Sequence, residues 1–174
     1  MAAFSGRIKS GFENVRYLKT GATVDYADPV DTSSPVFIRD LTSGTAANQA
    51  NIFYRSEVTI ASAGNFVVDL VGGMSDVFGT QINATSLVSL MIINRAVDDS
   101  AASNTTNVTL TTTLAGVFSG TTPALIIKPG GLFQIANTDA GGLCAVTATT
   151  ADTVTLTNAA GASAKVQICA IARG

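Results

Sequence analysis

Carboxylates are the first side chains of this 174-residue chain that suggest chemistry, because it holds 12 acidic residues and no histidine. Two carboxylates that face each other across a cleft hydrolyse glycosides, but no motif brings a pair together here. Without histidine, a Ser-His-Asp or Cys-His site and a His-ligated zinc are excluded within this chain. We therefore predict no enzyme activity, no catalytic residue, no metal and no cofactor. The isolated acids are Asp69, Asp76, Asp139 and Asp152.

Asp98, Asp99 and Asn104 carry the oxygen ligands that Ca²⁺ prefers. The two aspartates are adjacent, so along a strand they would point to opposite faces. The ligand spacing of a known calcium loop is missing, and weak calcium binding stays open as an alternative.

Two glycine pairs invite comparison with a phosphate-binding loop. Neither Gly72-Gly73 nor Gly130-Gly131 has that spacing or precedes a helical pattern. The second pair follows Pro129, which is typical of a corner that needs positive φ. We interpret this stretch as a structural turn rather than as a binding loop.

The composition favours a protein that is partly covered by other subunits. Apolar residues make up 47% of the chain and charged residues 13%, whereas about 25% charged residues is usual. A surface with so little charge predicts burial in an assembly. The alternative is a neutral surface of threonine, serine and asparagine.

The two cysteines, Cys144 and Cys169, are too few for a disulfide framework. The first residues do not have the pattern of a signal peptide, and the longest near-apolar run, Leu87 to Ile93, is too short to span a membrane. We expect a cytosolic protein with reduced thiols; a Cys144–Cys169 disulfide is the alternative.

Charge is uneven along the chain. Residues 1–20 have a side-chain net charge of +3 and the remainder a net charge of −5. A basic arm on an acidic body predicts that the arm reaches the acidic surface of a neighbour; the alternative is a solvated tail. Nucleic-acid binding is not expected, because the four basic side chains of the arm could neutralise only a few phosphates. The basic residues of the arm are Arg7, Lys9, Arg16 and Lys19, against Glu13 alone.

The chain divides into an extended N-terminal arm and strap, residues 1–50, and a β-domain, residues 51–174. Pro29 and Pro35 lie among turn residues in the strap, where Val36 to Leu41 is predicted to form a short docking strand. The later segments alternate apolar and polar residues with a period of two and are separated by turn clusters. We predict an all-β fold, an antiparallel β-sandwich or jelly roll of about eight strands.

Two segments of the β-domain are predicted to contact other subunits. Ser86 to Asn94 is apolar on both faces, so it is either a central strand covered on both sides or a strand packed against another subunit. The second face of the last strand mixes polar and apolar residues, which fits a subunit contact or a lightly covered sheet face. The candidate interface residues are Leu87, Met91, Ile93, Gln167, Cys169 and Ile171.

Three segments resemble small β-sandwich structural proteins of tailed bacteriophages. They are DLVGGMSDVFGT (69–80), LIIKPGGLFQIANTDAGG (125–142) and AVTATTADTVTLTNAAGASAKVQICAIA (145–172). In that group an aliphatic strand leads to a Pro-Gly-Gly turn, a short apolar strand and an Ala-Val-Thr/Ala-Asp-Thr pair. The resemblance covers residues 55–174 and rests on strand and turn chemistry, with no catalytic residue carried over.

The resemblance implies a virion component made in the host cytoplasm. We expect a capsid decoration or cement protein that binds the major capsid protein or other virion proteins as a homotrimer, without membrane or nucleic acid. The alternatives are a tail, baseplate or fibre-associated component and a carbohydrate-binding jelly roll. Sugar sites favour exposed aromatic platforms, and the chain has no tryptophan and only Tyr17, Tyr26 and Tyr54.

Overall fold

The computed structural model is all-β, with several antiparallel sheets and no helix in the part of the chain that it describes. Its strands follow the alternating apolar pattern of the sequence, in which every second side chain points to the same face. The described residues are 4–11, 16–17, 28–29, 36–76, 78–96, 103–115, 117 and 124–174.

The larger sheet is five-stranded and contains the last strand of the chain at its centre. Its order is β13-β10-β16-β6, with β14 also paired to β10, and every pairing in it is antiparallel. Its strands are β6 (Ile52–Ile60), β10 (Ser86–Ile93), β13 (Leu132–Ala136), β14 (Cys144–Ala145) and β16 (Ala164–Arg173).

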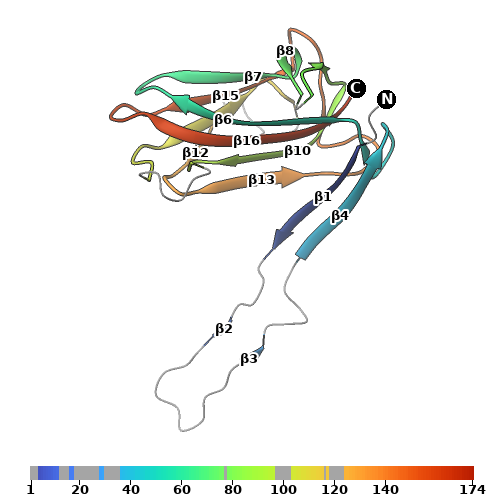
Figure 1. The fold of residues 1–174 in the computed structure, drawn as a ribbon, viewed down its shortest axis with the longest axis horizontal. Coiled ribbons are helices and arrows are strands. Elements are labelled where there is room, and N and C mark those ends of the chain that lie inside the picture. Colours follow the sequence, from blue (N-terminus) through green and yellow to red (C-terminus); the bar gives the residue numbers. More distant parts are fainter. Residues whose placement is uncertain are drawn as a thin grey trace.

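The smaller sheet is four-stranded, with the order β12-β11-β15-β7, and is also antiparallel throughout. The main core takes its buried residues from both sheets, which form two layers in Figure 1. The strands of the smaller sheet are β7 (Asn65–Asp69), β11 (Val108–Thr112), β12 (Ala124–Ile127) and β15 (Thr153–Asn158).

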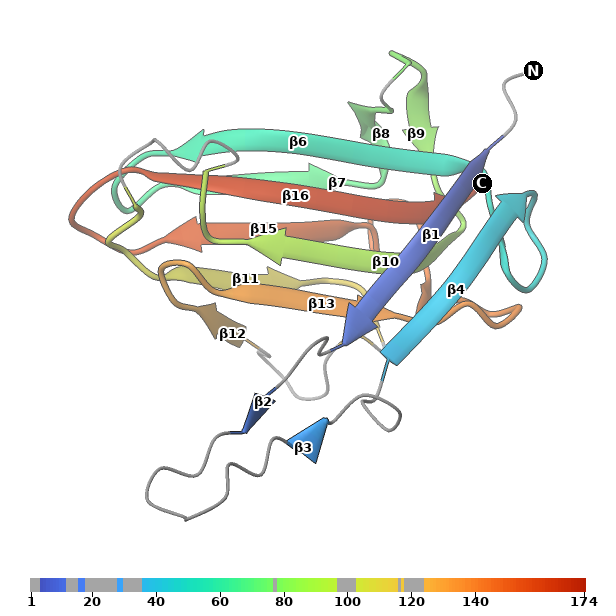
Figure 2. The same cartoon turned by 60° about the horizontal axis from the view of Figure 1, so that its bottom comes forward.

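The first strands form a separate hairpin at the N-terminus. β1 (Ser5–Gly11) pairs with β4 (Val36–Ser43) in antiparallel register, and β4 continues into a short parallel pair with β5 (Gln49–Ala50). Further out, β2 (Arg16–Tyr17) pairs with β3 (Asp28–Pro29). The segment predicted as a docking strand forms β4, and it pairs with β1 of the arm itself, whereas we expected an extended arm and strap. Figures 1 and 2 show the hairpin crossing one end of the five-stranded sheet and projecting past β13.

The Pro-Gly-Gly corner joins β12 to β13, and the positive φ predicted for it is confirmed. Gly130 has φ +73°, in the region that favours glycine. A Cβ on Gly131 would lie 2.8 Å from the Lys128 carbonyl oxygen, and the Gly131 amide donates to that same oxygen at 2.8 Å. The Gly130 amide also donates to the Asn94 carbonyl, which ties the corner to the end of β10.

A second hairpin, β8 (Val71–Ser75) and β9 (Gln81–Asn83), rises from the end of the domain (Figure 1). Its turn is held by Asp76, whose Oδ1 accepts hydrogen bonds from the amides of Phe78 and Thr80, both at 2.8 Å. Carboxylates commonly bond nearby backbone amides in this way in turns.

Candidate functional site

The N-terminal hairpin is anchored on the outer face of the five-stranded sheet by a small second core. Ile8 of β1 and Leu41 of β4 are buried together with Ala50 and with Val88 of β10. Ala136 and Ile171 of the same sheet pack against this cluster. The base of the hairpin is therefore part of the domain, while the far ends of β1 and β4 extend beyond it (Figure 1).

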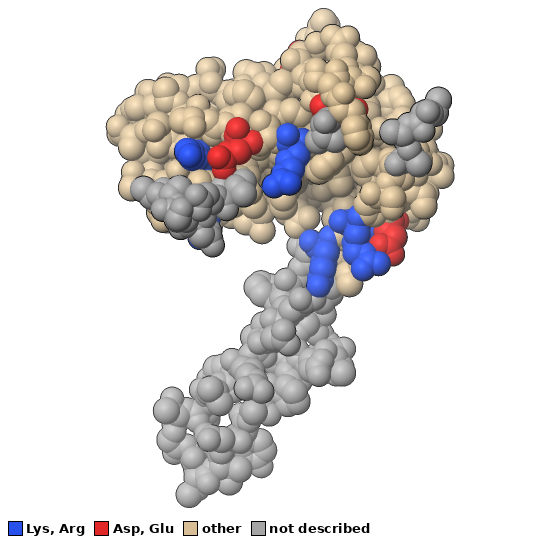
Figure 3. Space-filling view, viewed as in Figure 1, with Lys and Arg blue, Asp and Glu red and all other residues tan. Residues whose placement is uncertain are grey.

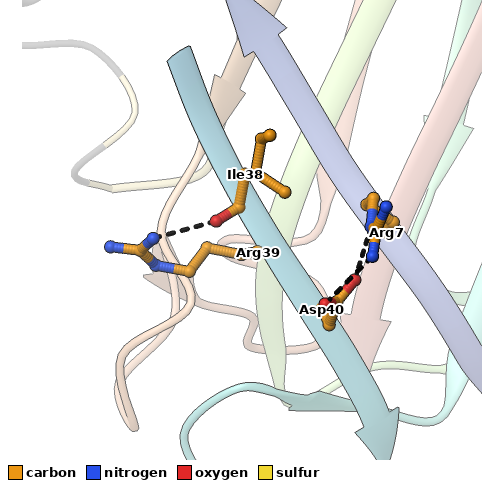
Figure 4. A network of polar contacts seen from close by, with 4 residues as sticks. All are labelled: Arg7, Ile38, Arg39 and Asp40. Carbon is orange, nitrogen blue, oxygen red and sulfur yellow. Dashed lines mark hydrogen bonds and ion pairs between the residues drawn. The ribbon is translucent and has the colours of Figure 1, made fainter. Parts of the chain in front are cut away.

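Charged side chains gather on the described part of the hairpin, whereas most of the domain surface in Figure 3 carries no charge. Arg7 and Asp40 lie opposite each other in the register, and Arg7 Nε donates to Asp40 Oδ1 at 2.6 Å (Figure 4). Because this hydrogen bond stabilises both charged forms, the pKa of Asp40 lies below its ordinary value and the pKa of Arg7 lies above its own.

Arg39 lies beside this pair on β4. Its guanidinium carbon is 5.1 Å from the centre of the Phe37 ring, a cation–π arrangement, and its Nη1 donates to the Ile38 carbonyl at 2.9 Å. Both contacts hold the guanidinium on the hairpin surface, and Figure 4 shows the hydrogen bond to Ile38.

The prediction of a basic arm needs correction at Arg7, because its charge is compensated by Asp40 within the hairpin. Lys9 is exposed and faces Ile38 across the hairpin. The side chain of Arg16 and the whole of Lys19 lie outside the described residues.

The return half of the arm explains the correction. Residues 21–50 have a net charge of −3, which balances the +3 of residues 1–20. In the described pairs, β1 of the basic half lies beside β4 of the acidic half, and β2 lies beside β3. The acidic residues of the return half are Asp25, Asp28, Asp31 and Asp40, against Arg39 alone.

The structure contradicts one predicted interface residue. Leu87 is fully buried in the main core together with Leu90 and Ile92, so it does not share a face with Met91. A β-bulge between Leu87 and Ser89 shifts the alternation by one residue, because two residues of β10 oppose one of β16 there.

The other predicted interface residues lie together on the outer face of the five-stranded sheet. Met91 is opposite Cys169, and Ile93 is opposite Gln167, in the β10–β16 register. All four are half-buried. Ile171, farther along the face, packs against the hairpin base. We call Met91, Ile93, Gln167 and Cys169 the neutral patch.

Both cysteines are free thiols, with Cys144 buried and Cys169 half-buried. Burial raises the pKa of each thiol above its ordinary value. The reactive thiolate is therefore a smaller fraction near neutral pH, which does not suit a nucleophile.

Arg173 is a buried structural residue that sequence reasoning missed. Its side chain is 1% exposed, yet its bonds are all to carbonyl oxygens rather than to a carboxylate. Nε donates to Gln49 of β5 at 2.9 Å, and the two terminal nitrogens donate to the segment 138–140. Burial lowers the pKa of Arg173 from its ordinary value. The guanidinium therefore joins the last strand to the base of the hairpin.

Three of the four acids singled out in the sequence, Asp69, Asp76 and Asp152, accept hydrogen bonds from backbone amides in turns. Asp69 Oδ1 accepts the Val71 amide at 2.8 Å, and Asp152 Oδ2 accepts the Thr149 amide at 2.5 Å. Among the described residues, no group of three acids, cysteines or histidines is placed to hold a metal.

The calcium hypothesis loses one of its ligands. Asp98 and Asp99 lie outside the described residues. Asn104 is buried, and its Oδ1 accepts the Lys165 amide at 2.9 Å while its Nδ2 donates to Asn94 Oδ1 at 2.7 Å. Its amide cross-links β10 to β16 and is not presented to an ion.

Tyr54 is 7% exposed and belongs to the main core, so it does not offer an aromatic platform. Burial also raises the pKa of its hydroxyl. Tyr26 and the side chain of Tyr17 lie outside the described residues.

Comparison of the chain with protein-family models, with curated proteins and with solved structures finds no match. In the described residues, no helix is long and apolar enough to cross a membrane.

Proposed function

We propose that this chain is a structural protein of a bacteriophage virion, a decoration or cement protein that binds and stabilises the capsid shell as a homotrimer. The observation that carries the proposal is the N-terminal hairpin, which is anchored at its base by Ile8 and Leu41 and projects beyond the domain. An arm of this kind is suited to reach a neighbouring subunit, while the sparsely charged domain packs beside it.

We further propose that the two sheets form a jelly roll, an architecture found in viral capsid proteins. The two sheet orders support this reading, because β6, β16, β10 and β13 lie in the same sequence as β7, β15, β11 and β12. Along the chain the strands of this set change sheet at every step except from β11 to β12, which are neighbours in the smaller sheet, and β16 and β15 insert beside β6 and β7.

Antibody labelling of phage particles tests the location. Particles are purified from the lysate that yields this protein, and an antibody against residues 51–174 is applied to them. We expect labels on the shell. Labels confined to the tail would select the tail, baseplate or fibre alternative, and unlabelled particles would overturn a virion role.

Replacing the tip of the arm tests the binding role more sharply than deleting the arm. Gly11 and Val36 are the last pair of the β1–β4 register, so residues 12–35 are replaced by an Asn-Gly turn, which suits a two-residue hairpin. This change keeps Ile8 and Leu41 in place. Shells stripped of the protein should bind the full-length chain but not this variant, and equal binding would remove the tip from the proposal.

The neutral patch is the proposed contact between copies. A charge introduced by Met91→Glu should dissociate the trimer, because an unpaired carboxylate is costly in an interface. Thr59→Glu is the matched control, since Thr59 is exposed on β6 of the same sheet. Light scattering should report a trimer for the control and a monomer for Met91→Glu; a trimer in both would remove the patch from the proposal.

The carbohydrate-binding alternative has less support. Its aromatic platform would need an exposed tyrosine, and Tyr54 is buried. A glycan array probed with the full chain distinguishes the two functions, because specific glycan binding would favour the alternative.

A further inference from the structure

The hairpin base lies on a surface of the five-stranded sheet that is separate from the main core. Ile8 and Leu41 are buried together with Val88 of β10, and none of the three belongs to the core that joins the two sheets. The hairpin can therefore leave the sheet without opening the main core. The residues of the sheet that meet the hairpin, which we call the seat, are Val88, Ala136 and Ile171.

The seat is a built-in feature of β10. Leu87 points into the main core, and the β-bulge between Leu87 and Ser89 brings Val88 to the hairpin instead. The seat therefore depends on the fold of the domain and does not depend on which hairpin occupies it.

The hairpin is joined to its own domain by a short reversal of the chain, residues 44–48, which we call the hinge. β4 and β5 pair in parallel, so the hinge must turn the chain back between them. Parallel strands ordinarily need a connection of about a dozen residues or more. Gly44 has φ +141° and Asn48 has φ +55°, both in the region that favours glycine. Short hinges under strain favour exchange of the element that they hold.

The domain end of the hinge is fixed in place. The Asn48 amide donates to the Thr138 carbonyl at 2.7 Å, and the Thr138 hydroxyl donates to Asn48 Oδ1 at 2.9 Å. Arg173 Nε donates to the Gln49 carbonyl at 2.9 Å. If the hinge straightens, β5 therefore stays on its own domain, and β1 and β4 move together because they pair with each other.

The proposed contact between copies lies next to the seat. Ser89 is opposite Ile171 and Met91 is opposite Cys169, so the seat and the neutral patch are successive rungs of one sheet face. A copy that covers the neutral patch therefore borders the seat. An extended hinge of five residues spans roughly 17 Å, which lets β4 of one copy reach the seat of the copy beside it.

We propose that the hairpin base of each copy occupies the seat of the next copy in the oligomer. The chain itself identifies the occupant, because the seat already fits Ile8 and Leu41. Exchange keeps the contacts of the base and releases the hinge. Each copy gives one hairpin and receives one, and head-to-tail contacts of this kind can close into a ring. The inference rests on the homotrimer of the proposed function and agrees with its symmetry.

A disulfide between the hairpin and the seat distinguishes exchange from a hairpin that stays on its own domain. Ile8→Cys and Val88→Cys are combined in a full-length chain that also carries Cys144→Ala and Cys169→Ala. The purified protein is oxidised and separated on a denaturing gel without reductant. We expect bands of two and three linked chains, because the bridge joins neighbouring copies. Bridges confined to single chains would overturn the proposal.

The matched control is Arg7→Cys with Asp40→Cys on the same background. Arg7 and Asp40 face each other within the hairpin, so their bridge stays inside one chain in either arrangement. The control should migrate as a single chain. Linked chains at equal yield in the control would show that copies are joined by collision, and would also overturn the proposal.

The length of the hinge gives a second test that remains decisive if no bridge forms. Insertion of Gly-Ser-Gly-Ser between Ala46 and Ala47 should relax the closed monomer, because a longer loop reverses without strain. The concentration at which the trimer half-dissociates should then rise about tenfold, as measured by light scattering. Deletion of Thr45 and Ala46 should lower it. An unchanged value after the insertion, or a wild type that is monomeric, would overturn the proposal.

Particle labelling separates this inference from the proposed function. Copies bridged through positions 8 and 88, together with unlabelled phage particles, would support the exchange and remove the virion role. Labelled shells with bridges confined to single chains would give the opposite result.

Discussion

The N-terminal hairpin and the two-sheet domain are stabilised on very different scales. The domain has a continuous core that both sheets share, whereas the hairpin meets it through a cluster centred on Ile8, Leu41, Ala50 and Val88. Apolar burial is the largest favourable term in folding. Because of this difference in buried apolar area, most of the folding free energy comes from the domain. The hairpin opens at a much lower free-energy cost and is the part that can change conformation when a partner binds.

The largest effect should come from the core of the domain. Ile168 lies on the central strand β16 and is fully buried, so Ile168→Ala should lower the free energy of unfolding by about 3 to 4 kcal/mol. Urea denaturation measures the loss. The neighbouring Gln167→Ala, on the half-buried outer face, should change it by less than about 0.5 kcal/mol. Similar losses of unfolding free energy in both variants would contradict the conclusion that the main core contributes most of the stability.

The residue that joins the two regions comes next. Arg173→Met removes the donors that satisfy the carbonyls of Gln49 and of residues 138–140, and each buried acceptor left unpaired is costly. We expect a loss of about 2 to 3 kcal/mol in thermal or urea denaturation. Arg173→Lys should restore only part of it, because an ammonium lacks the planar fork of the guanidinium. Full stability in Arg173→Lys would show that charge alone matters there.

Weakening the hairpin base should show that the hairpin opens independently of the domain. Ile8→Ala should lower the free energy of opening the hairpin by about 2 kcal/mol, and the urea midpoint of the domain should stay unchanged. Hydrogen exchange in residues 5–11 and 36–43 measures the opening. Thr42→Ala, at an exposed position of β4, is the control and should leave exchange unaltered. A lowered domain midpoint in Ile8→Ala would mean that the two regions unfold together.

The smallest effect concerns the ion pair on the hairpin surface. The folded-state pKa of Asp40 is lowered, so the contribution of the pair is present above the ordinary aspartate pKa and is lost as pH falls through the lowered value. Arg7 and Asp40 are both largely exposed, so solvent screens the pair and stability should barely change. An NMR titration should show the Asp40 pKa rising in Arg7→Gln; an unchanged pKa would mean that the pair does not form in solution.

The fold class could be predicted because the alternation is local. Val154 and Leu156, expected to point inward from the period of two, are both fully buried in the main core. At Leu87 the same reasoning was wrong, because a continuous apolar run does not reveal a bulge. The alternation therefore predicted which segments form strands, but at Leu87 it did not predict which face of the sheet the side chain occupies.

The features that sequence reasoning missed depend on distant partners. β1 pairs with β4 across residues 12–35, so nothing within β1 alone indicates a strand. Arg173 is buried by Gln49 and by residues 138–140, and a terminal arginine on an alternating strand is ordinarily expected in solvent.

The central position of β16 determines when the domain folds during synthesis. Ile60 of β6 pairs with Ala164, and Ile92 of β10 pairs with Ile168. Both strands can therefore pair only after β16, the last of the sixteen strands, has been synthesised. Until then the nascent chain exposes apolar strands with unpaired edges, a state prone to aggregation. Long-range pairing of this kind is also slow. Chaperone binding to the nascent chain should therefore protect the yield of this protein more than it protects one whose central strands are made first.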